Sequence, residues 1–238
     1  MPLLRRRAKK DAPLKISVVI PTLNEAKALP ESLKAVHCHR PHEVIVADGG
    51  SDDGTQDIAR RAGCRVVVSP PGRAMQMNAG ARAATGDLLL FLHADSRVSE
   101  KCFARMLQAM NRGERVGGAF SLAIESDLWS LKMISLLATL RSRYLHLVYG
   151  DQAIFVRAGA FRELGGFSPL PICEDLDFFR RLKNHGPVVL LREKTLTSAR
   201  RWRAEGVFFT TARNIAIAAL FLLGFSPKIL SRWYLVIR

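Results

Sequence analysis

The sequence predicts an α/β fold with a mostly parallel sheet. Short apolar runs rich in β-branched residues cover residues 16–20, 43–47, 65–69 and 87–92, and segments with a helical pattern separate them. Each run is too short for a helix and is bounded by turn residues, which is typical of a buried parallel strand. The alternation of strand and helix indicates successive βαβ units.

The helices expected between these strands have recognisable ends. Thr22 and Glu25 have the spacing of a capping box, which predicts a helix over residues 26–37. A second helix is expected over residues 54–63, where glycines mark both ends. A third is expected over residues 73–84, ahead of the fourth strand.

The second half of the chain has more widely spaced signals. A long helix is predicted over residues 128–147 and a strand over residues 153–156. A further helix over residues 176–182 carries an apolar stripe and begins with two acidic residues. Two more helices are expected over residues 207–223 and 227–236.

Polar clusters lie just after the predicted strands or at a predicted helix start. They are Thr22-Leu23-Asn24-Glu25, Asp48-Gly49-Gly50-Ser51-Asp52, His93-Ala94-Asp95 and Glu174-Asp175. Taken singly, each cluster is explained by a turn or a helix N-cap, because Asp, Asn and Ser side chains form local hydrogen bonds there. The carboxyl ends of parallel strands open on one crevice, so the recurrence of such clusters favours a shared ligand site.

These clusters, together with residues 78–86 and with Asp177 and Arg180, resemble the ordered signatures of the family 2 nucleotide-sugar glycosyltransferases. The resemblance spans about residues 16–202. No single segment is specific, but the combination is. It implies a GT-A fold, a nucleotide-diphosphosugar donor, a divalent cation and inversion at the anomeric carbon.

The resemblance implies a nucleotide site at the ends of the first strands. Asp48 would accept the imide N–H of a uracil ring. Arg73 begins a helix, where a guanidinium and a helix N-terminus suit a diphosphate, although a solvated surface arginine is the simpler alternative. The residues expected at the nucleotide are Pro21, Thr22, Asn24, Glu25, Asp48, Gly49, Arg73, Asn78, His93 and Ala94.

Asp95 is the expected metal ligand. Its carboxylate would hold Mn²⁺ or Mg²⁺ against the diphosphate, because hard oxygen ligands suit both ions. The family's usual Asp-x-Asp reads His93-Ala94-Asp95 here. His93 is a second candidate ligand, since imidazole suits Mn²⁺, and the alternative is a hydrogen-bonded core histidine.

The resemblance assigns the general base to Asp175, which would deprotonate the acceptor hydroxyl. The acceptor side is expected to comprise Gly150, Asp151, Gln152, Glu174, Arg201 and Trp202. Residues 198–202 resemble the Gln-x-x-Arg-Trp element of processive members, but Ser198 replaces the glutamine. That replacement argues against polymerisation.

The net charge of +15 is concentrated at the two ends of the 238-residue chain. Residues 1–15, a basic tail, hold six Lys or Arg and one Asp, and residues 192–238 hold nine Lys or Arg and two Glu. Residues 16–203 are predicted to form the catalytic domain and residues 204–238 a basic, apolar helical segment. The apolar run 215–225 is shorter than the roughly 20 residues that span a bilayer.

The 204–238 segment therefore predicts either interfacial helices on an anionic membrane or ordinary packing onto the domain. Nucleic acid is not expected as a partner, because no recognition motif is present. Four cysteines without metal-site spacing and the lack of a signal peptide pattern predict a cytoplasmic protein. The basic, apolar 204–238 segment predicts that this protein is peripheral on the inner membrane face. The acceptor is left open and includes lipid-linked hydroxyls.

Two alternative functions use the same features. A nucleotidyltransferase shares such a sheet, but it is expected to have a glycine-rich, basic loop where this chain has residues 22–25. A catalytically inactive, membrane-associated binding module is disfavoured by the joint presence of Asp48, Asp95 and Asp175.

Overall fold

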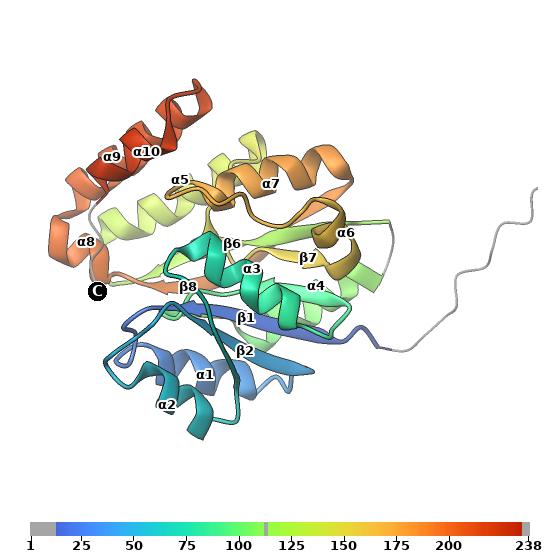
Figure 1. Cartoon of the computed structure of the whole chain (residues 1–238). Helices are drawn as coiled ribbons and strands as arrows, with labels where there is room; N and C mark the ends of the chain where they lie inside the picture. Colours follow the sequence, from blue (N-terminus) through green and yellow to red (C-terminus); the bar gives the residue numbers. More distant parts are fainter. Residues whose placement is uncertain (1–12, 112–113, 235–238) are drawn as a thin grey trace, which may run out of the picture.

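The computed structural model describes residues 13–111 and 114–234, and these form an eight-stranded mixed sheet with helices on both faces (Figure 1). The strands are β1 (Ile16–Thr22), β2 (Glu43–Asp48), β3 (Arg65–Val68), β4 (Leu88–Phe91), β5 (Ser96–Arg97), β6 (Gly117–Glu125), β7 (Phe155–Arg157) and β8 (Val188–Ser198). Their order in the sheet is β3-β2-β1-β4-β7-β6-β8-β5. The predicted α/β class with a mostly parallel sheet is confirmed.

The first four strands are mutually parallel, and β7 is antiparallel to both of its neighbours, β4 and β6. The register places Thr22 opposite Asp48 at the carboxyl ends of β1 and β2. Polar side chains that are 26 residues apart in the chain therefore meet at one edge of the sheet.

The helices are α1 (Leu29–His37), α2 (Thr55–Arg61), α3 (Arg73–Ala83), α4 (Glu100–Asn111), α5 (Trp129–Leu145), α6 (Ala158–Glu163), α7 (Glu174–His185), α8 (Arg200–Glu205), α9 (Val207–Leu222) and α10 (Pro227–Leu230). Short 3-10 helices cover Gly150–Gln152 and Ser231–Trp233. Figure 1 shows α1 and α2 below the sheet, α7 above it, and α8 to α10 at the end toward which the parallel strands point.

Alternate residues of the central strands enter two separate cores, because successive side chains of a strand point to opposite faces. Val18 and Ile20 pack with the α1 and α4 side chains, whereas Val19 packs with those of α3 and α7. Both faces of the central strands are thus buried, as their continuous apolar runs predict. A third, smaller core joins the end of β6 to α5 and α8.

One predicted helix boundary is wrong. Thr22 is the last residue of β1 and its hydroxyl donates to Asp48, so it does not cap a helix. Glu25 accepts backbone bonds from Ala28 and Leu29 in a turn, and α1 begins only at Leu29, with a proline in its first turn. The capping-box spacing was therefore met by a strand end and a turn.

Four elements were not predicted: β5, β6, β8 and α4. Strand β5 has only two residues and β8 is only partly buried, but β6 is a largely buried strand of nine residues. The predicted strand 153–156 is partly confirmed: residues 155 and 156 lie in β7, and a 3-10 helix over Gly150–Gln152 precedes them. The predicted helix over residues 227–236 is α10 with a 3-10 turn, and its last two residues lie outside the described part of the chain. Cys38, Cys64, Cys102 and Cys173 are free thiols.

Gly80 explains why α3 lies so close to the sheet. A Cβ atom at this position would lie 2.4 Å from a methyl carbon of Val19 in β1. Only glycine permits that approach, which brings the start of α3 to the carboxyl end of β1. Arg73, the first residue of α3, is thereby held over the edge where the polar clusters gather.

Candidate active site

A cavity with a volume of about 500 Å³ opens at the carboxyl ends of β1 and β4. Most of the predicted site residues line it: Pro21, Thr22, Glu25, Arg73, His93, Ala94, Asp95, Gly150, Asp151, Glu174, Asp175, Arg201 and Trp202. Asn24, Asp48, Gly49, Asn78 and Gln152 do not line it. The structure thus brings residues that lie up to 181 positions apart in the sequence to one place.

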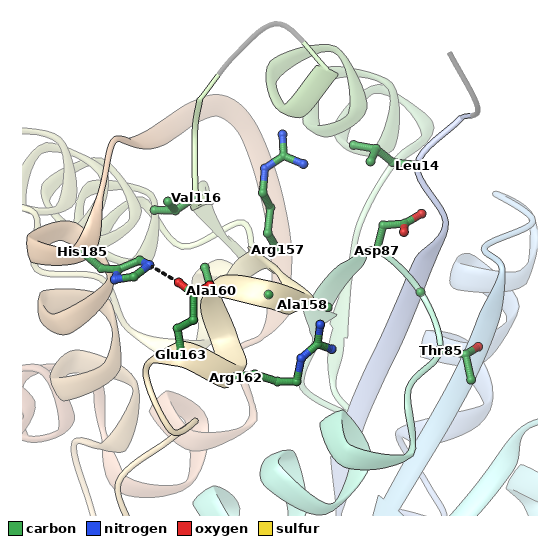
Figure 2. Close-up of a pocket in the computed structure, with 12 residues that line it drawn as sticks. Leu14, Thr85, Asp87, Val116, Arg157, Ala158, Ala160, Arg162, Glu163 and His185 are labelled. Atoms are coloured by element: carbon green, nitrogen blue, oxygen red, sulfur yellow. Dashed lines mark ion pairs between the residues drawn. The ribbon is translucent and has the colours of Figure 1, made fainter. Parts of the chain in front are cut away.

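Figure 2 shows a second hollow, of about 600 Å³, at the opposite end of the strands, around Asp87 and α6. Three of its charged side chains have structural partners. His185 lies 3.1 Å from Glu163, and a carboxylate oxygen of Asp87 accepts the backbone N–H of Lys15 at 2.9 Å. No residue predicted for the site lines this hollow.

Asp48 holds the loop that follows β2. Its Oδ1 accepts the backbone N–H groups of Gly50 and Ser51 and the Gln56 amide at 2.8 to 3.0 Å, and its Oδ2 accepts the hydroxyls of Thr22 and Ser51. Burial alone would raise the pKa of Asp48, but these hydrogen bonds lower it below its ordinary value. A base contact by Asp48 therefore requires one of the side-chain donors to move away.

Three other predicted residues connect loops and do not face the cavity. Asn24 accepts the backbone N–H of Asp52 at 3.1 Å, which joins the loops after β1 and β2. Asn78 makes a reciprocal pair of bonds with the backbone of Phe167, at 2.8 and 2.9 Å. Gln152 is buried and donates to the Phe120 carbonyl at 2.9 Å. Each fixes the position of a segment that does line the cavity.

Gln76 performs a similar task, and the sequence analysis missed it. Its buried amide donates to the carbonyls of Thr22 and Ala47, at the ends of β1 and β2. The Thr22 carbonyl also accepts the Gly49 N–H at 2.9 Å, so Gln76 adds a second bond there and ties α3 to the ends of both strands. A single glutamine inside a helix gives no sequence signal for this role.

Asp175, Gly150 and His93 are in direct contact. The Asp175 Oδ2 atom accepts the Gly150 N–H at 2.5 Å, and Oδ1 accepts the Leu176 N–H at 2.7 Å. A Cβ atom at Gly150 would lie 2.6 Å from His93 Nε2 and 3.2 Å from Asp175 Oδ2. A larger residue at this position would displace the His93 side chain, and two backbone N–H groups hold both oxygens of Asp175 in a fixed orientation.

Three ionisable side chains at the cavity have pKa values shifted from their ordinary range. Burial raises the pKa of Glu174 to about 7, and Asp175 adds to this while Arg73, whose Nη1 lies 3.4 Å away, opposes it. Burial raises the pKa of Asp151 to about 6. Burial, with Arg73 and Arg201 nearby, lowers the pKa of His93 well below its ordinary value, so the imidazole is neutral at pH 7. Perturbed groups gathered in one cavity are typical of a functional site.

Asp95 has a carboxylate that is free to take a cation. Its side chain is 23% exposed, and its nearest cationic neighbour is Arg200, at 3.8 Å. Arg200 instead forms two bonds with Glu25, at 3.0 and 3.1 Å. Within the described residues, no group of three or more His, Cys, Asp or Glu side chains is arranged to hold a metal ion. The donor set therefore fits an ion such as Mg²⁺ or Mn²⁺ that takes one carboxylate and completes its shell with substrate phosphates and water.

The C-terminal helices also line the cavity. Asn214, Ile217 and Ala218 reach it from α9, and Tyr234 follows the last 3-10 turn. The Arg201 guanidinium lies 4.4 Å from the centre of the Tyr234 ring. Residues of the 204–234 segment therefore form part of one wall of the cavity.

Unpartnered polar atoms concentrate at this wall. In residues 13–111 and 114–234, five buried side-chain N or O atoms have no hydrogen-bond partner, and three belong to residues lining the cavity: Asp151 Oδ1, Trp202 Nε1 and Asn214 Oδ1. Each such atom costs about 1–3 kcal/mol when it is left unsatisfied. Two acceptors and one donor suit hydroxyl groups, which both donate and accept. Asn214 is a candidate that no sequence motif indicated.

Replacing Asp151 with asparagine should change how stability depends on pH. The folded protein binds this proton more tightly than the unfolded chain, with a pKa of about 6 against 3.8, so the wild-type free energy of unfolding falls as pH rises through that interval. Asparagine does not titrate. The free energy of unfolding of the variant, relative to that of wild type, should therefore rise by on the order of 2–3 kcal/mol between roughly pH 4 and pH 8.

Urea unfolding at roughly pH 4 and pH 8, without metal or nucleotide, measures the free energy of unfolding of the variant and of wild type. Asp57→Asn, at an exposed position on α2, is the matched control. A difference between Asp151→Asn and wild type that stays constant with pH would contradict the raised pKa.

Comparison with known proteins identifies the family of this chain. The family model described as glycosyl transferase family 2 matches residues 17–162, which is more than half of the chain. The chain belongs to glycosyl transferase family 2. Membership of this family sets the nucleotidyltransferase alternative aside.

Curated relatives and solved structures are similar to this chain. An uncharacterized glycosyltransferase of Mycobacterium tuberculosis is 32% identical over 99 residues, which cover 41% of this chain and 44% of that protein. The mannosyltransferase PcManGT of Pyrobaculum calidifontis, solved with GDP-Man and Mn²⁺, superposes with a TM-score of 0.67 at 19% identity, covering 91% of this chain and 67% of the other.

A third similar protein is glucosyl-3-phosphoglycerate synthase of M. tuberculosis, solved with Mn²⁺, UDP and its product. It has a TM-score of 0.56 at 21% identity, over 76% of this chain and 70% of the other. These likenesses show the GT-A fold, which is confirmed. The chain spans less than half the length of the curated relatives that it matches.

Proposed function

We propose that this glycosyltransferase moves a sugar from a UDP-sugar to an acceptor hydroxyl by a single inverting displacement. Asp95 would hold Mn²⁺ or Mg²⁺, and Asp175 would act as the general base. The observation that carries the proposal is the convergence of Asp95, Asp175 and Arg73 on one cavity at the strand ends. Asp95 follows β4, Arg73 begins α3 and Asp175 lies in the first turn of α7. Three separate elements thus supply the charged side chains that such a reaction needs.

The nucleotide diphosphate would lie between β1 and α3. Arg73 and Arg201 face the cavity, and the pKa of Arg201, which burial and nearby arginines lower to about 10, keeps it charged at pH 7. The loop held by Asp48 would lie against the uracil, and Thr22 would support this loop through its hydrogen bond to Asp48. A divalent cation at Asp95 would supply charge neutralisation for the departing diphosphate.

Asp175 is oriented for proton transfer before substrate arrives, because two backbone N–H groups hold its oxygens. The acceptor oxygen forms its bond to the anomeric carbon as the bond from that carbon to the diphosphate oxygen breaks. The hydroxyl proton passes to Asp175, and the nucleoside diphosphate leaves. Since the base and the leaving group lie on opposite sides of the sugar, one displacement inverts the anomeric centre.

The acceptor would enter beside α9. Trp202 and Asn214 offer the unpartnered donor and acceptor, and Ile217 and Ala218 give the same wall an apolar part. Gly150, Asp151 and Glu174 would complete this side, and a lipid-linked hydroxyl fits such a mixed wall. We propose a cytoplasmic enzyme that works at the inner membrane face.

A thermal-shift panel of UDP- and GDP-sugars, each with and without Mn²⁺, tests the donor. A ligand at a hundred times its dissociation constant stabilises the protein by about 2.7 kcal/mol. We expect the full shift only for UDP-sugars with Mn²⁺, accompanied by slow UDP release. A larger shift with GDP-mannose would overturn the uridine assignment. No shift with any nucleotide sugar would overturn the proposed function and favour an inactive binding module.

A further inference from the structure

Exposed apolar side chains are concentrated in two segments of the described chain. Of the seventeen large hydrophobic residues that are exposed in residues 13–111 and 114–234, fifteen lie in residues 128–145 or 208–233. The other two, Val68 and Met75, lie elsewhere. Scattered exposed hydrophobic residues are ordinary, but a concentration of this kind marks an interaction surface.

Helix α5 carries large apolar side chains on the face that points away from the domain. Its buried residues include Ser135 and Ser142, whereas Trp129, Leu137 and Tyr144 are 57% to 74% exposed. The two serines satisfy backbone groups inside the domain: Ser135 donates to the Leu131 carbonyl at 2.9 Å. The exposed leucine and tryptophan side chains add nothing to the core of the domain, and an exposed apolar face of this kind suits an interaction surface.

Helix α9 has two different faces. Arg213 and Ile217 point inward, where Arg213 is paired with Glu205 and both side chains are only 6% exposed. On the outer face Phe208 is 87%, Ile215 60% and Leu223 75% exposed. Since α5 and α9 are in contact, their outer faces are neighbours.

The positive charge on these two segments favours an anionic partner. Residues 129–145 and 200–234 hold nine Lys or Arg and one acidic residue, Glu205, which is already neutralised by Arg213. A two-fold dimer would bring this basic surface against itself, and like charges would oppose it. An anionic bilayer offers opposite charge together with an apolar interior. Trp129 and Trp233, which are 74% and 54% exposed, suit the interface of such a bilayer.

We propose that the outer faces of α5 and α9, with residues 223–233, form one surface that docks on an anionic phospholipid bilayer. The inference rests on the proposed function and deepens it, because the inner face of the docked helix α9 lines the acceptor wall. Among the described residues, no helix is long and apolar enough to cross a bilayer. Docking would thus be to the membrane surface, by partial insertion of side chains.

Co-sedimentation of the full chain with vesicles tests this surface. Wild type should bind vesicles of phosphatidylcholine mixed with phosphatidylglycerol more tightly than phosphatidylcholine alone, with tryptophan fluorescence shifting to the blue. The triple variant Leu137→Ser, Phe208→Ser, Leu223→Ser should bind at least about tenfold more weakly, because three inserted apolar side chains are lost. Val68→Ser with Met75→Ser is the matched control and should bind like wild type.

The charge contribution is tested separately with Lys132→Gln, Lys228→Gln and Arg232→Gln together. This variant should bind the anionic vesicles more weakly and with a smaller dependence on salt. Two results would overturn the proposal: wild type remaining in the supernatant with anionic vesicles, or a dimer in sedimentation velocity that the triple apolar variant dissociates. Because UDP binding is measured without vesicles, a failure of docking is distinguishable from a failure of the proposed function.

Discussion

Asp175→Asn should lower turnover by about 10² to 10⁴ while the affinity for UDP and Mn²⁺ stays within a few-fold of wild type. The expected loss is the usual contribution of a general base, because an amide cannot accept the acceptor's proton. Binding should persist because Asp175 contacts Gly150 and Leu176 on the acceptor side of the cavity. Calorimetry for binding and UDP release for turnover measure the two effects separately.

The substitution has a structural cost that a control must measure. Both oxygens of Asp175 accept backbone N–H groups, and an asparagine NH₂ group would face one of these donors. Asp177→Asn, on the same helix and outside the cavity, is the matched control, since its carboxylate also accepts structural bonds, from Ser168 and Arg181. A thermal melt of both variants shows whether folding is affected. Turnover that survives in a folded Asp175→Asn variant would move the base to Glu174 or Asp151.

Asp95→Asn should remove the part of UDP affinity that depends on Mn²⁺. An amide oxygen is a poor substitute for a carboxylate at a hard divalent cation, and the diphosphate would keep its charge unneutralised. We expect at least a tenfold loss of affinity with Mn²⁺ present, no change without it, and loss of turnover. Calorimetric titrations of UDP with and without Mn²⁺ measure this.

The local structure should tolerate that change, because Arg200 keeps its two bonds to Glu25 and lies 3.8 Å from Asp95. Asp57→Asn, on the outside of α2, is the control for the removal of one negative charge. A variant at Asp95 whose affinity still rises with Mn²⁺ would place the cation elsewhere, and His93 with the diphosphate would be the next site to examine.

The active-site region was predictable to the extent that it depends on strand ends. Asp48, Asp95 and Asp175 follow recognisable strands or begin a helix, and parallel strands carry such residues to one edge. Asn24, Asn78 and Gln152 show the limit. Their residue types and positions matched the expected pattern, but the direction of each side chain depends on loop contacts that sequence spacing does not encode.

The sequence by itself determined the α/β class, the positions of the first four strands along the chain and the family, because period, turn residues and motif order are local properties. The tertiary structure alone decided where the long-range partners lie. It paired Arg200 with Glu25, 175 residues away, placed Asn214 on the cavity wall and turned four of the five leucines of α5 outward. Those outcomes depend on which surfaces of α5, α8 and α9 pack against the sheet. Packing of this kind is set by the shape and burial of many residues at once, so no single segment of the sequence specifies it.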